Sequence, residues 1–170
     1  MTKIPGPITS PPSEEELAGR LERVRSLMEE GDLDYYVSFD PVNIYYLTNF
    51  ANYVHERPFI MVIPTKGTPK MVCPLLETTH VKTRARLGLE YVTYYEFPAP
   101  EGENWFDVYQ SLIDAGARVG VESAMPLGIA EKTPGEQVID DLIDEVRLVK
   151  TEYEIGRTVH ACKIINEGHR

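Results

Sequence analysis

The sequence predicts a three-layer α/β/α domain built on a mixed sheet. Short apolar and β-branched runs alternate along the chain with segments of helical periodicity, an order typical of α/β domains. Two of the runs, 58–64 and 70–73, flank a short turn at 65–68, which predicts an antiparallel hairpin within the sheet. The 170 residues, 42% of them hydrophobic, are enough for one compact core.

The first helix is expected to begin after Ser13. Ser13 and Glu16 have the spacing of a capping box, in which a hydroxyl and a carboxylate bind the first free amides of a helix. Gly31 is placed to end the helix. Between them four apolar residues recur at helical spacing, and Glu and Arg fill the other face: Leu17, Leu21, Val24 and Met28.

The later elements are expected in alternation. Strands are predicted over 34–39, 58–64, 70–73, 89–97, 118–121 and 137–140. The run at 59–63 is apolar throughout, as in a strand covered on both faces. Helices are predicted over 43–47, 75–87, 105–113, 126–132 and 142–149. A second capping box, Thr151 to Glu154, opens a last helix that is predicted to reach about Asn166.

Composition and charge argue against several classes of function. The formal net charge of −10 disfavours binding to nucleic acid, although a basic, histone-like partner stays possible. No stretch approaches the roughly 20 apolar residues of a membrane span. Residues 1–12 lack the apolar run of a secretory signal and are expected to form a loose tail. We therefore expect a cytoplasmic protein that binds neither nucleic acid nor membrane.

The chain contains no local motif for metal binding or catalysis. Its four histidines are dispersed, and phosphate-loop, zinc-protease and serine-hydrolase motifs are absent from the sequence. Cys73 and Cys162 follow apolar residues and are expected to be buried thiols of a reducing compartment, in preference to a disulfide or a nucleophile. Four carboxylates could hold a metal, but a solvated acidic face is the favoured interpretation: Asp140, Asp141, Asp144 and Glu145.

One polar loop is a candidate binding segment. Tyr53, His55 and Arg57 lie just before the strand predicted at 58–64. A guanidinium beside a rigid strand can grip a carboxylate through two parallel hydrogen bonds. A surface ion pair, for example between Arg57 and Glu56 or Glu77, explains the same residues equally well.

Four phrases resemble one family in the right order. DPVNIYYLTNF at 40–50 resembles the signature of creatinase/prolidase amino-terminal domains, with Asn49 where Gly is usual. VIPTKGTP at 62–69 resembles the hairpin of that family, and VGVE at 119–122 resembles a later strand. RLVKTEYEI at 147–155 resembles its junction with the catalytic domain. The resemblance extends over residues 13–170.

The resemblance implies an organisation in three parts. Residues 1–12 would be the tail, residues 13–150 the amino-terminal domain, and residues 151–170 the start of a "pita-bread" catalytic domain. The peptidases of the family bind two divalent metal ions (Mn, Co or Zn) in that catalytic domain through Asp, His and Glu ligands. No residue of this chain matches those ligands, so the resemblance implies no metal site and no catalytic residue here.

The resemblance also gives the polar loop a role. The chain would belong to a metal-dependent Xaa-Pro dipeptidase, aminopeptidase or related amidohydrolase that forms homodimers. Aligned on the apolar strand, Arg57 stands where the family places a substrate-binding Arg, which acts on the partner's active site. His55 stands where the family has an aromatic residue, and Tyr53 is nearby. The substrate would be a small peptide or amide. The alternative is a catalytically inactive module that binds peptides or histones, and a self-sufficient small enzyme is disfavoured.

Overall fold

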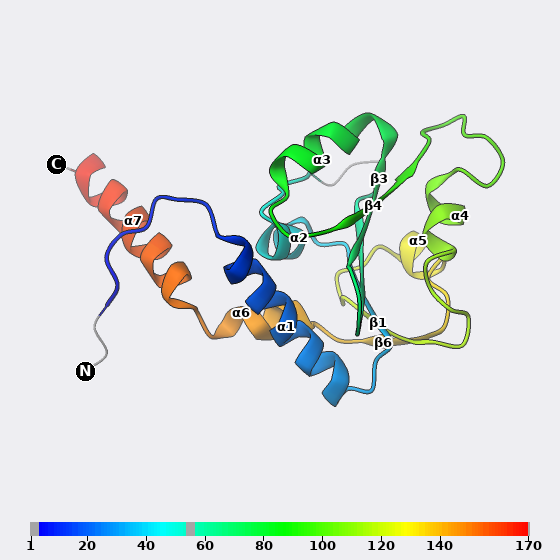
Figure 1. Ribbon diagram of the computed structural model, residues 1–170, viewed down its shortest axis with the longest axis horizontal. Coiled ribbons are helices and arrows are strands. Elements are labelled where there is room, and N and C mark those ends of the chain that lie inside the picture. Colours follow the sequence, from blue (N-terminus) through cyan, green and yellow to red (C-terminus); the bar gives the residue numbers. More distant parts are fainter. Residues whose placement is uncertain (1–3, 54–56, 170) are drawn as a thin grey trace.

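The computed structural model describes residues 4–53 and 57–169, and six strands of it form one mixed sheet in the order β4-β3-β2-β1-β5-β6 (Figure 1). Strand β2 is antiparallel to both of its neighbours, and all other neighbouring strands are parallel. The predicted hairpin and the mixed sheet are therefore confirmed. The strands are β1 (Tyr35–Ser38), β2 (Ile60–Pro64), β3 (Lys70–Pro74), β4 (Glu90–Tyr94), β5 (Arg118–Val121) and β6 (Glu136–Ile139).

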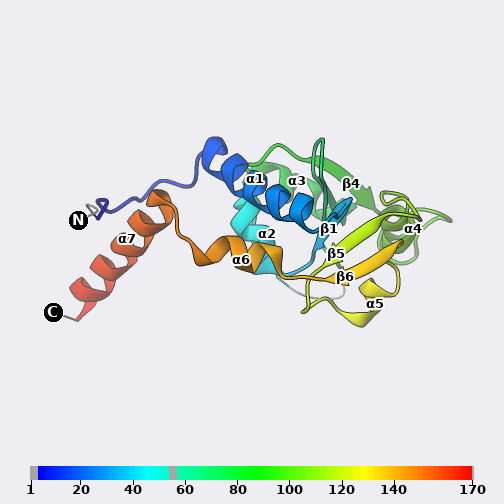
Figure 2. The same cartoon turned by 90° about the horizontal axis from the view of Figure 1, so that it is seen from below.

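Helices cover both faces of this sheet, which confirms the three-layer prediction (Figure 2). One face packs against α1 (Glu14–Glu30), α2 (Pro41–Thr48), α3 (Thr78–Arg84) and α6 (Leu142–Leu148). The other face packs against α4 (Trp105–Gln110) and α5 (Leu127–Ala130). A 3-10 turn, η1 (Leu75–Glu77), precedes α3, and α7 (Glu152–Gly168) follows α6.

Strand β2 explains why one run of the sequence is apolar without interruption. Met61 and Ile63 point into the core beneath α1 and α2, whereas Ile60 and Val62 point into the core beneath α4 and α5. Successive side chains of a strand face opposite sides of the sheet, so a strand between two helical layers needs apolar residues at every position. All four residues are buried.

Several boundaries differ from the sequence prediction. The helix expected over 75–87 is a 3-10 turn followed by the shorter α3, and the strand expected over 89–97 ends at Tyr94. The turn expected at 43–47 is the two-turn helix α2, which Asp40 caps by accepting bonds from the amides of Val42 and Asn43. Asn49 ends α2 in the left-handed conformation at φ 63°.

Helix α1 has the predicted apolar stripe but only half of the predicted capping box. Ser13 Oγ accepts a hydrogen bond from Glu16 N at 3.2 Å, as expected. The carboxylate of Glu16 instead accepts bonds from Arg20 Nε at 3.0 Å and Thr151 Oγ1 at 2.8 Å. Arg20, which was expected on the charged outer face, is buried because its guanidinium donates to Tyr46 O at 2.7 Å.

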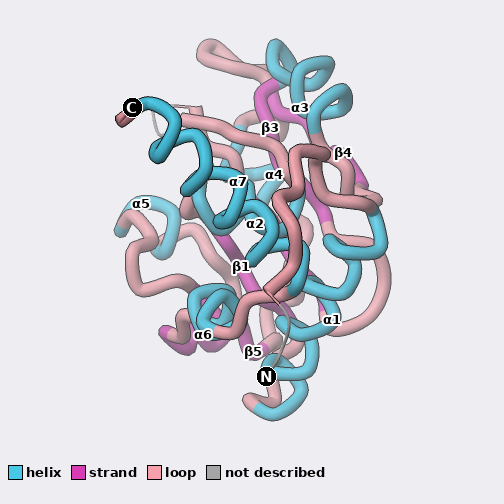
Figure 3. The backbone as a smooth tube through the Cα atoms, turned by 90° about the vertical axis from the view of Figure 1, so that its left-hand side faces the viewer, coloured by secondary structure: helices cyan, strands magenta, loops and turns pink. Residues whose placement is uncertain are grey.

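Helix α7 extends away from the sheet, and an extended amino-terminal segment runs beside it (Figures 1 and 3). Its capping box between Thr151 and Glu154 is complete, as predicted. The amide of Ile8 donates to Gly156 O at 3.0 Å, and Tyr153 Oη donates to Ser10 O at 3.0 Å. Residues 6–10, which we name the amino-terminal strap, thus contact α7 even though they have no regular secondary structure.

Strand direction brings several loops to one edge of the sheet. Strands β1, β3, β4, β5 and β6 all end at this edge, and the antiparallel β2 begins there. We name it the carboxyl edge. Crevices at the carboxyl ends of strands are common binding sites in open α/β sheets, so the residues that follow these strands are the first candidates for function.

Candidate functional site

Arg57 lies at the carboxyl edge, three residues before β2 begins. Its Nε atom is 4.0 Å from Oε1 of Glu96, which follows β4, and both side chains are about one-third exposed. A partly exposed ion pair of this length contributes little to stability. Glu77, one of the two partners suggested by the sequence, lies 3.1 Å from His80 Nδ1, and Glu56, the other, lies outside the described residues.

The other two candidates of the loop are placed differently. The side chain of Tyr53 is 85% exposed, so its ring is presented to solvent. His55 lies outside the described residues, and its predicted role stays a prediction. The structure therefore locates two of the three candidate residues.

The chain directly after Arg57 is held firmly. Tyr94 Oη donates a hydrogen bond to Pro58 O at 3.1 Å, and the rings of Phe59 and Phe50 pack with their centroids 5.4 Å apart. Phe59 and Tyr94 are both buried. Arg57 is thus attached to a rigid support, as a binding residue requires.

Several exposed apolar side chains follow β3 and β4 or precede β2 at the carboxyl edge. In the sheet register Pro74 pairs with Tyr94, so the residues just after β3 and β4 are neighbours, and β2 begins beside them. Leu75 and Leu76 follow β3, Tyr95 and Phe97 follow β4, and Tyr53 precedes β2. The sequence alone did not predict this group. We name it the apolar rim: Tyr53, Leu75, Leu76, Tyr95 and Phe97, the last of which is 99% exposed.

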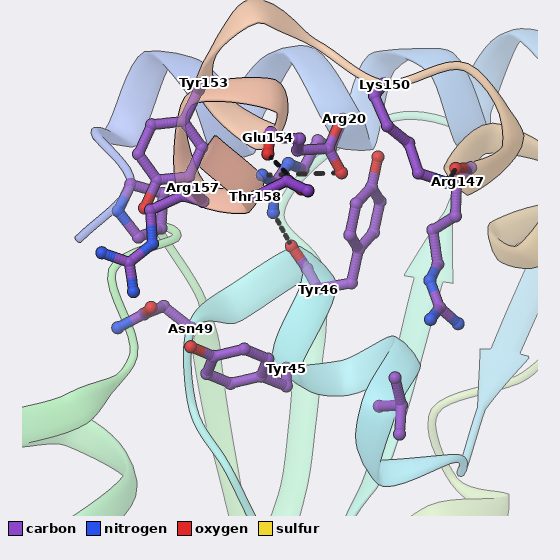
Figure 4. Close-up of a pocket in the computed structure, with 12 residues that line it drawn as sticks. Arg20, Tyr45, Tyr46, Asn49, Arg147, Lys150, Tyr153, Glu154, Arg157 and Thr158 are labelled. Atoms are coloured by element: carbon purple, nitrogen blue, oxygen red, sulfur yellow. Dashed lines mark hydrogen bonds and ion pairs between the residues drawn. The ribbon is translucent and has the colours of Figure 1, made fainter. Parts of the chain in front are cut away.

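A second feature is a pocket between α2 and α7 of about 380 Å³ (Figure 4). We name it the α2–α7 cleft. Tyr45, Tyr46 and Asn49 line it from α2, and Tyr153 and Arg157 line it from α7. Sequence reasoning did not identify the cleft, because its walls come from opposite ends of the chain.

Glu122 is a third feature that the sequence analysis did not single out. It directly follows β5 and is buried at the carboxyl edge. Its carboxylate accepts bonds from Ser38 Oγ at 2.6 Å, from the amides of Phe39 and Asp40 at 2.7 Å each, and from Asn43 Nδ2 at 3.0 Å. Burial raises the pKa of this carboxyl, and the four hydrogen bonds oppose that effect. All four donors belong to β1, α2 and their connection, so Glu122 holds the start of α2.

The acidic group at 140–145 makes structural contacts. Asp141 accepts bonds from the amide and the hydroxyl of Ser123, and Asp144 accepts one from Arg147 at 2.8 Å. Within the described residues, no three His, Cys, Asp or Glu side chains are arranged to hold a metal ion. In the same part of the chain no helix has the length and apolar character needed to cross a membrane.

The two cysteines have different environments. Cys73 is buried in β3, as predicted, and burial raises the pKa of its thiol to about 11. Cys162 is exposed on α7, so the prediction that it is buried is wrong. Its apolar neighbours in sequence, Ala161 and Ile164, are exposed as well, because among the described residues α7 is buried near Gly156 and not near its carboxyl end.

The order of the six strands and the helices on both faces of the sheet define the class of the fold, an α/β domain with a mixed sheet. Residues 20–149 match the model of the Creatinase/Prolidase N-terminal domain, so the chain belongs to this family.

Relatives and solved structures agree with that assignment. An uncharacterized peptidase of Staphylococcus epidermidis is 26% identical over 140 residues, which are 80% of this chain and 38% of that protein. The amino-terminal domain of an X-Pro dipeptidase from Streptococcus pyogenes has a TM-score of 0.63 at 18% identity, over 77% of this chain and 98% of that one. Prolidase from Pyrococcus horikoshii has a TM-score of 0.67 at 20% identity, and the match covers 89% of this chain and 41% of that one. The chain thus spans about two fifths of its full-length relatives.

Proposed function

We propose that this chain is the non-catalytic amino-terminal domain of a metal-dependent Xaa-Pro dipeptidase or aminopeptidase, or of a related amidohydrolase. The observation that carries the proposal is the family match over residues 20–149 together with relatives that are called peptidases and are more than twice as long. The domain boundaries that we propose are residues 13–150 for this domain and 151–170 for the start of the catalytic domain.

The metal chemistry belongs to the rest of the enzyme in this proposal. The described residues offer no group of three metal-binding side chains, so they do not fit a pair of divalent ions. In peptidases such ions, here Mn, Co or Zn, activate water and polarise the amide carbonyl. This domain would contribute substrate access and assembly.

Arg57 is the proposed contact to substrate, and His55 and Tyr53 are proposed to assist it. Its position supports this role, because it lies on a rigid support at the carboxyl edge and its side chain is partly exposed there. A guanidinium there can bind the terminal carboxylate of a small peptide through two hydrogen bonds. The substrate would lie in the active site of a second copy of the enzyme.

The apolar rim supports the proposed homodimer. Aromatic and aliphatic side chains exposed together around one Arg are typical of the centre of a protein interface. The side chains of Phe97, after β4, and Leu76, after β3, are 99% and 68% exposed. We propose that the second copy covers them and so receives Arg57 at its active site. A cytoplasmic location is also proposed, and the free thiols of Cys73 and Cys162 support it.

Kinetics of the full-length enzyme test the role of Arg57. The enzyme loaded with Mn²⁺ or Co²⁺ is assayed with Xaa-Pro dipeptides, with creatine and ectoine alongside. Arg57→Ala should raise KM about tenfold or more and leave the melting temperature unchanged, because a charge-assisted contact to substrate is lost while the buried core is intact. Arg84→Ala, on the exposed side of α3, is the matched control. Unchanged KM in the Arg57 variant would remove the proposed role.

Assembly is tested separately. Phe97→Ser should shift the full-length protein from dimer toward monomer in analytical ultracentrifugation, whereas Leu127→Ser, an equally apolar exposed site on α5, should not. If no peptide, creatine or ectoine is hydrolysed and the full-length protein instead binds basic peptides, the inactive binding module is the better description. The net charge of −10 is compatible with that outcome.

A further inference from the structure

We propose that the α2–α7 cleft binds a small organic carboxylate with an apolar body, about the size of an N-acylated amino acid. The cleft is separate from the Arg57 loop, and the proposal does not depend on peptidase activity. Its volume of about 380 Å³ lies in the range of pockets that hold small ligands.

Charge is the first argument. Four cationic side chains line the cleft against one carboxylate, that of Glu154, in a chain that has 27 acidic and only 17 basic residues. Such a local excess of positive charge on an otherwise acidic protein attracts anions to the cleft. The four are Arg20, Arg147, Lys150 and Arg157.

These cations differ in what they already bind. Arg20 is paired with Glu16, and Arg147 with Asp144. Arg157 Nη1 donates to Thr9 O at 2.8 Å and to Ile8 O at 3.3 Å, and Lys150 Nζ donates to Arg147 O. Within residues 4–53 and 57–169, neither Lys150 nor Arg157 forms a salt bridge with a carboxylate. Two positive charges at the cleft therefore lack an anionic partner in the described structure.

Arg157 is the residue best prepared for a carboxylate. The amino-terminal strap holds its guanidinium through Nη1 alone, so Nε and Nη2 keep donors that point in parallel. That pair of donors matches the two oxygens of a carboxylate. Figure 4 shows Arg157 projecting from α7 toward the side of the cleft where Asn49 and Tyr45 rise from α2.

The opposite wall supplies apolar surface and one amide. Tyr45 and Val42 are half-exposed on α2 although both are largely apolar. Asn49 occupies a left-handed position, φ 63°, where Gly would be free of strain. Gly is usual at this position in the family phrase, so the turn can form without a side chain. The side-chain amide of Asn49 is therefore available to line the cleft. A ligand could therefore place its aromatic or aliphatic body between the tyrosines and its carboxylate at Arg157. It would then contact both walls of the cleft.

NMR titration of the 170-residue chain tests the proposal. The probe is N-acetylphenylalanine, and its uncharged amide, N-acetylphenylalaninamide, is the matched control ligand. We expect saturable shifts of the Arg157 Nε–H and Asn49 Nδ2 signals with the acid and none with the amide. No saturable shift, or equal shifts with both ligands, would overturn the proposal.

Three variants locate the binding. Arg157→Gln should weaken binding about tenfold or more, and Lys163→Gln, the same charge change on α7 outside the cleft, should leave it unchanged. Because Arg157→Gln could also release the strap, a second variant, Asn49→Gly, is needed. It keeps the left-handed turn and leaves α7 and the strap unchanged. It should weaken binding severalfold. Wild-type affinity in both cleft variants would place the ligand elsewhere and refute the assignment.

Discussion

The hydroxyl of Ser38 donates a hydrogen bond of 2.6 Å to the buried carboxylate of Glu122 and so joins the ends of two neighbouring parallel strands, β1 and β5. The same carboxylate accepts bonds from the amides of Phe39 and Asp40 and from Asn43. Asn43 in turn accepts a bond from Arg147 at 2.8 Å, which extends the network to α6. One acidic side chain therefore sets where α2 begins, and α2 forms a wall of the α2–α7 cleft.

Glu122→Gln should destabilise the domain by about 1–3 kcal/mol, because a carboxamide brings an NH2 group to a site where each oxygen faces two donors. Urea denaturation followed by far-UV circular dichroism measures the change. Glu145→Gln, on the exposed face of α6, is the control and should have no effect. If the urea midpoint of Glu122→Gln equals that of the wild type, the charged carboxylate does not stabilise the network.

The sheet and its two helical layers were predictable because they depend on local periodicity. The stripe of Leu17, Leu21, Val24 and Met28 predicted α1 to within a residue, and the uninterrupted apolar run predicted that β2 is buried on both faces. Boundaries failed where tertiary contacts decide them. The helix expected over 75–87 is instead the 3-10 turn η1 followed by the shorter α3.

The sites were less predictable than the fold. Arg20 has the spacing of a surface residue on an amphipathic helix, yet it is buried because its acceptors, Tyr46 O and Glu16, are brought together only by folding. Arg57 was found from the sequence since the charged loop directly precedes an obvious strand. The cleft could not be found, because Tyr45 and Arg157 lie far apart along the chain and each alone looks like an ordinary surface residue.

Arg20→Ala should cost about 3 kcal/mol of folding stability. The guanidinium lies 4.3 Å from the centre of the Tyr46 ring and joins α1 to α2, and Glu154 of α7 is 3.9 Å from Nη2. Removal leaves the Tyr46 carbonyl and the Glu16 carboxylate without this donor. Urea denaturation compares this variant with Arg84→Ala, which changes the same residue type on an exposed helix face. Equal losses in the two variants would contradict a structural role for Arg20.

Gly120→Ala should destabilise the domain by about 1–3 kcal/mol, because a methyl group overpacks a core without room for it. The added Cβ would lie 2.7 Å from Tyr36 Cδ2 and 2.8 Å from Leu33 Cδ1, and both side chains are buried. Gly116→Ala is the control, since nothing lies within 4 Å of its added Cβ. Thermal unfolding compares the two variants. If Gly120→Ala melts at as high a temperature as Gly116→Ala, the packing at Gly120 is not tight.

The two thiols should react at very different rates. Cys73 is buried with a pKa of about 11, so at pH 8 it is protonated and inaccessible, whereas Cys162 is exposed. With iodoacetamide we expect rapid modification of Cys162 alone and modification of Cys73 only after unfolding, as measured by peptide mass spectrometry. The Cys162→Ser variant should therefore be inert under native conditions. Its rapid modification at pH 8 would show that β3 opens easily.

The same thiol gives the domain a weak dependence on alkaline pH. The folded pKa of Cys73 is raised, so the unfolded chain loses its proton first as pH increases. The contribution of Cys73 to the free energy of unfolding is fully present below the unfolded pKa of about 8.5. It decreases as the pH rises toward 11. Cys73→Ala, which cannot titrate, should be less stable than the wild type by an amount that shrinks across this window. A constant difference from pH 8 to 11 would be inconsistent with the raised pKa.

Gly156 and Ile8 together decide whether the amino-terminal strap stays on α7. A Cβ at Gly156 would lie 2.6 Å from Ile8 Cδ1 and 3.0 Å from the carbonyl oxygen of Gly6, so Gly156→Ala should displace the strap. The domain itself should not lose stability, because Ala in place of Gly favours the helix by about 1 kcal/mol. The expected result is loss of hydrogen-exchange protection at the Ile8 amide, which donates to Gly156 O, with the protection of the sheet amides unchanged.

A second substitution distinguishes steric displacement from a change in the helix. Ile8→Ala removes the δ-carbon that the new methyl group meets, so the double variant should regain part of the exchange protection that Gly156→Ala loses. Gly168→Ala, at the far end of α7 where nothing lies within 4 Å, is the control and should leave the strap in place. Full protection of the Ile8 amide in Gly156→Ala would mean that the close approach is relieved by the side chain of Ile8 alone. The strap would then stay in contact with α7. The hydrogen bonds from Arg157 to the carbonyl oxygens of Ile8 and Thr9 would then form whether position 156 is Gly or Ala.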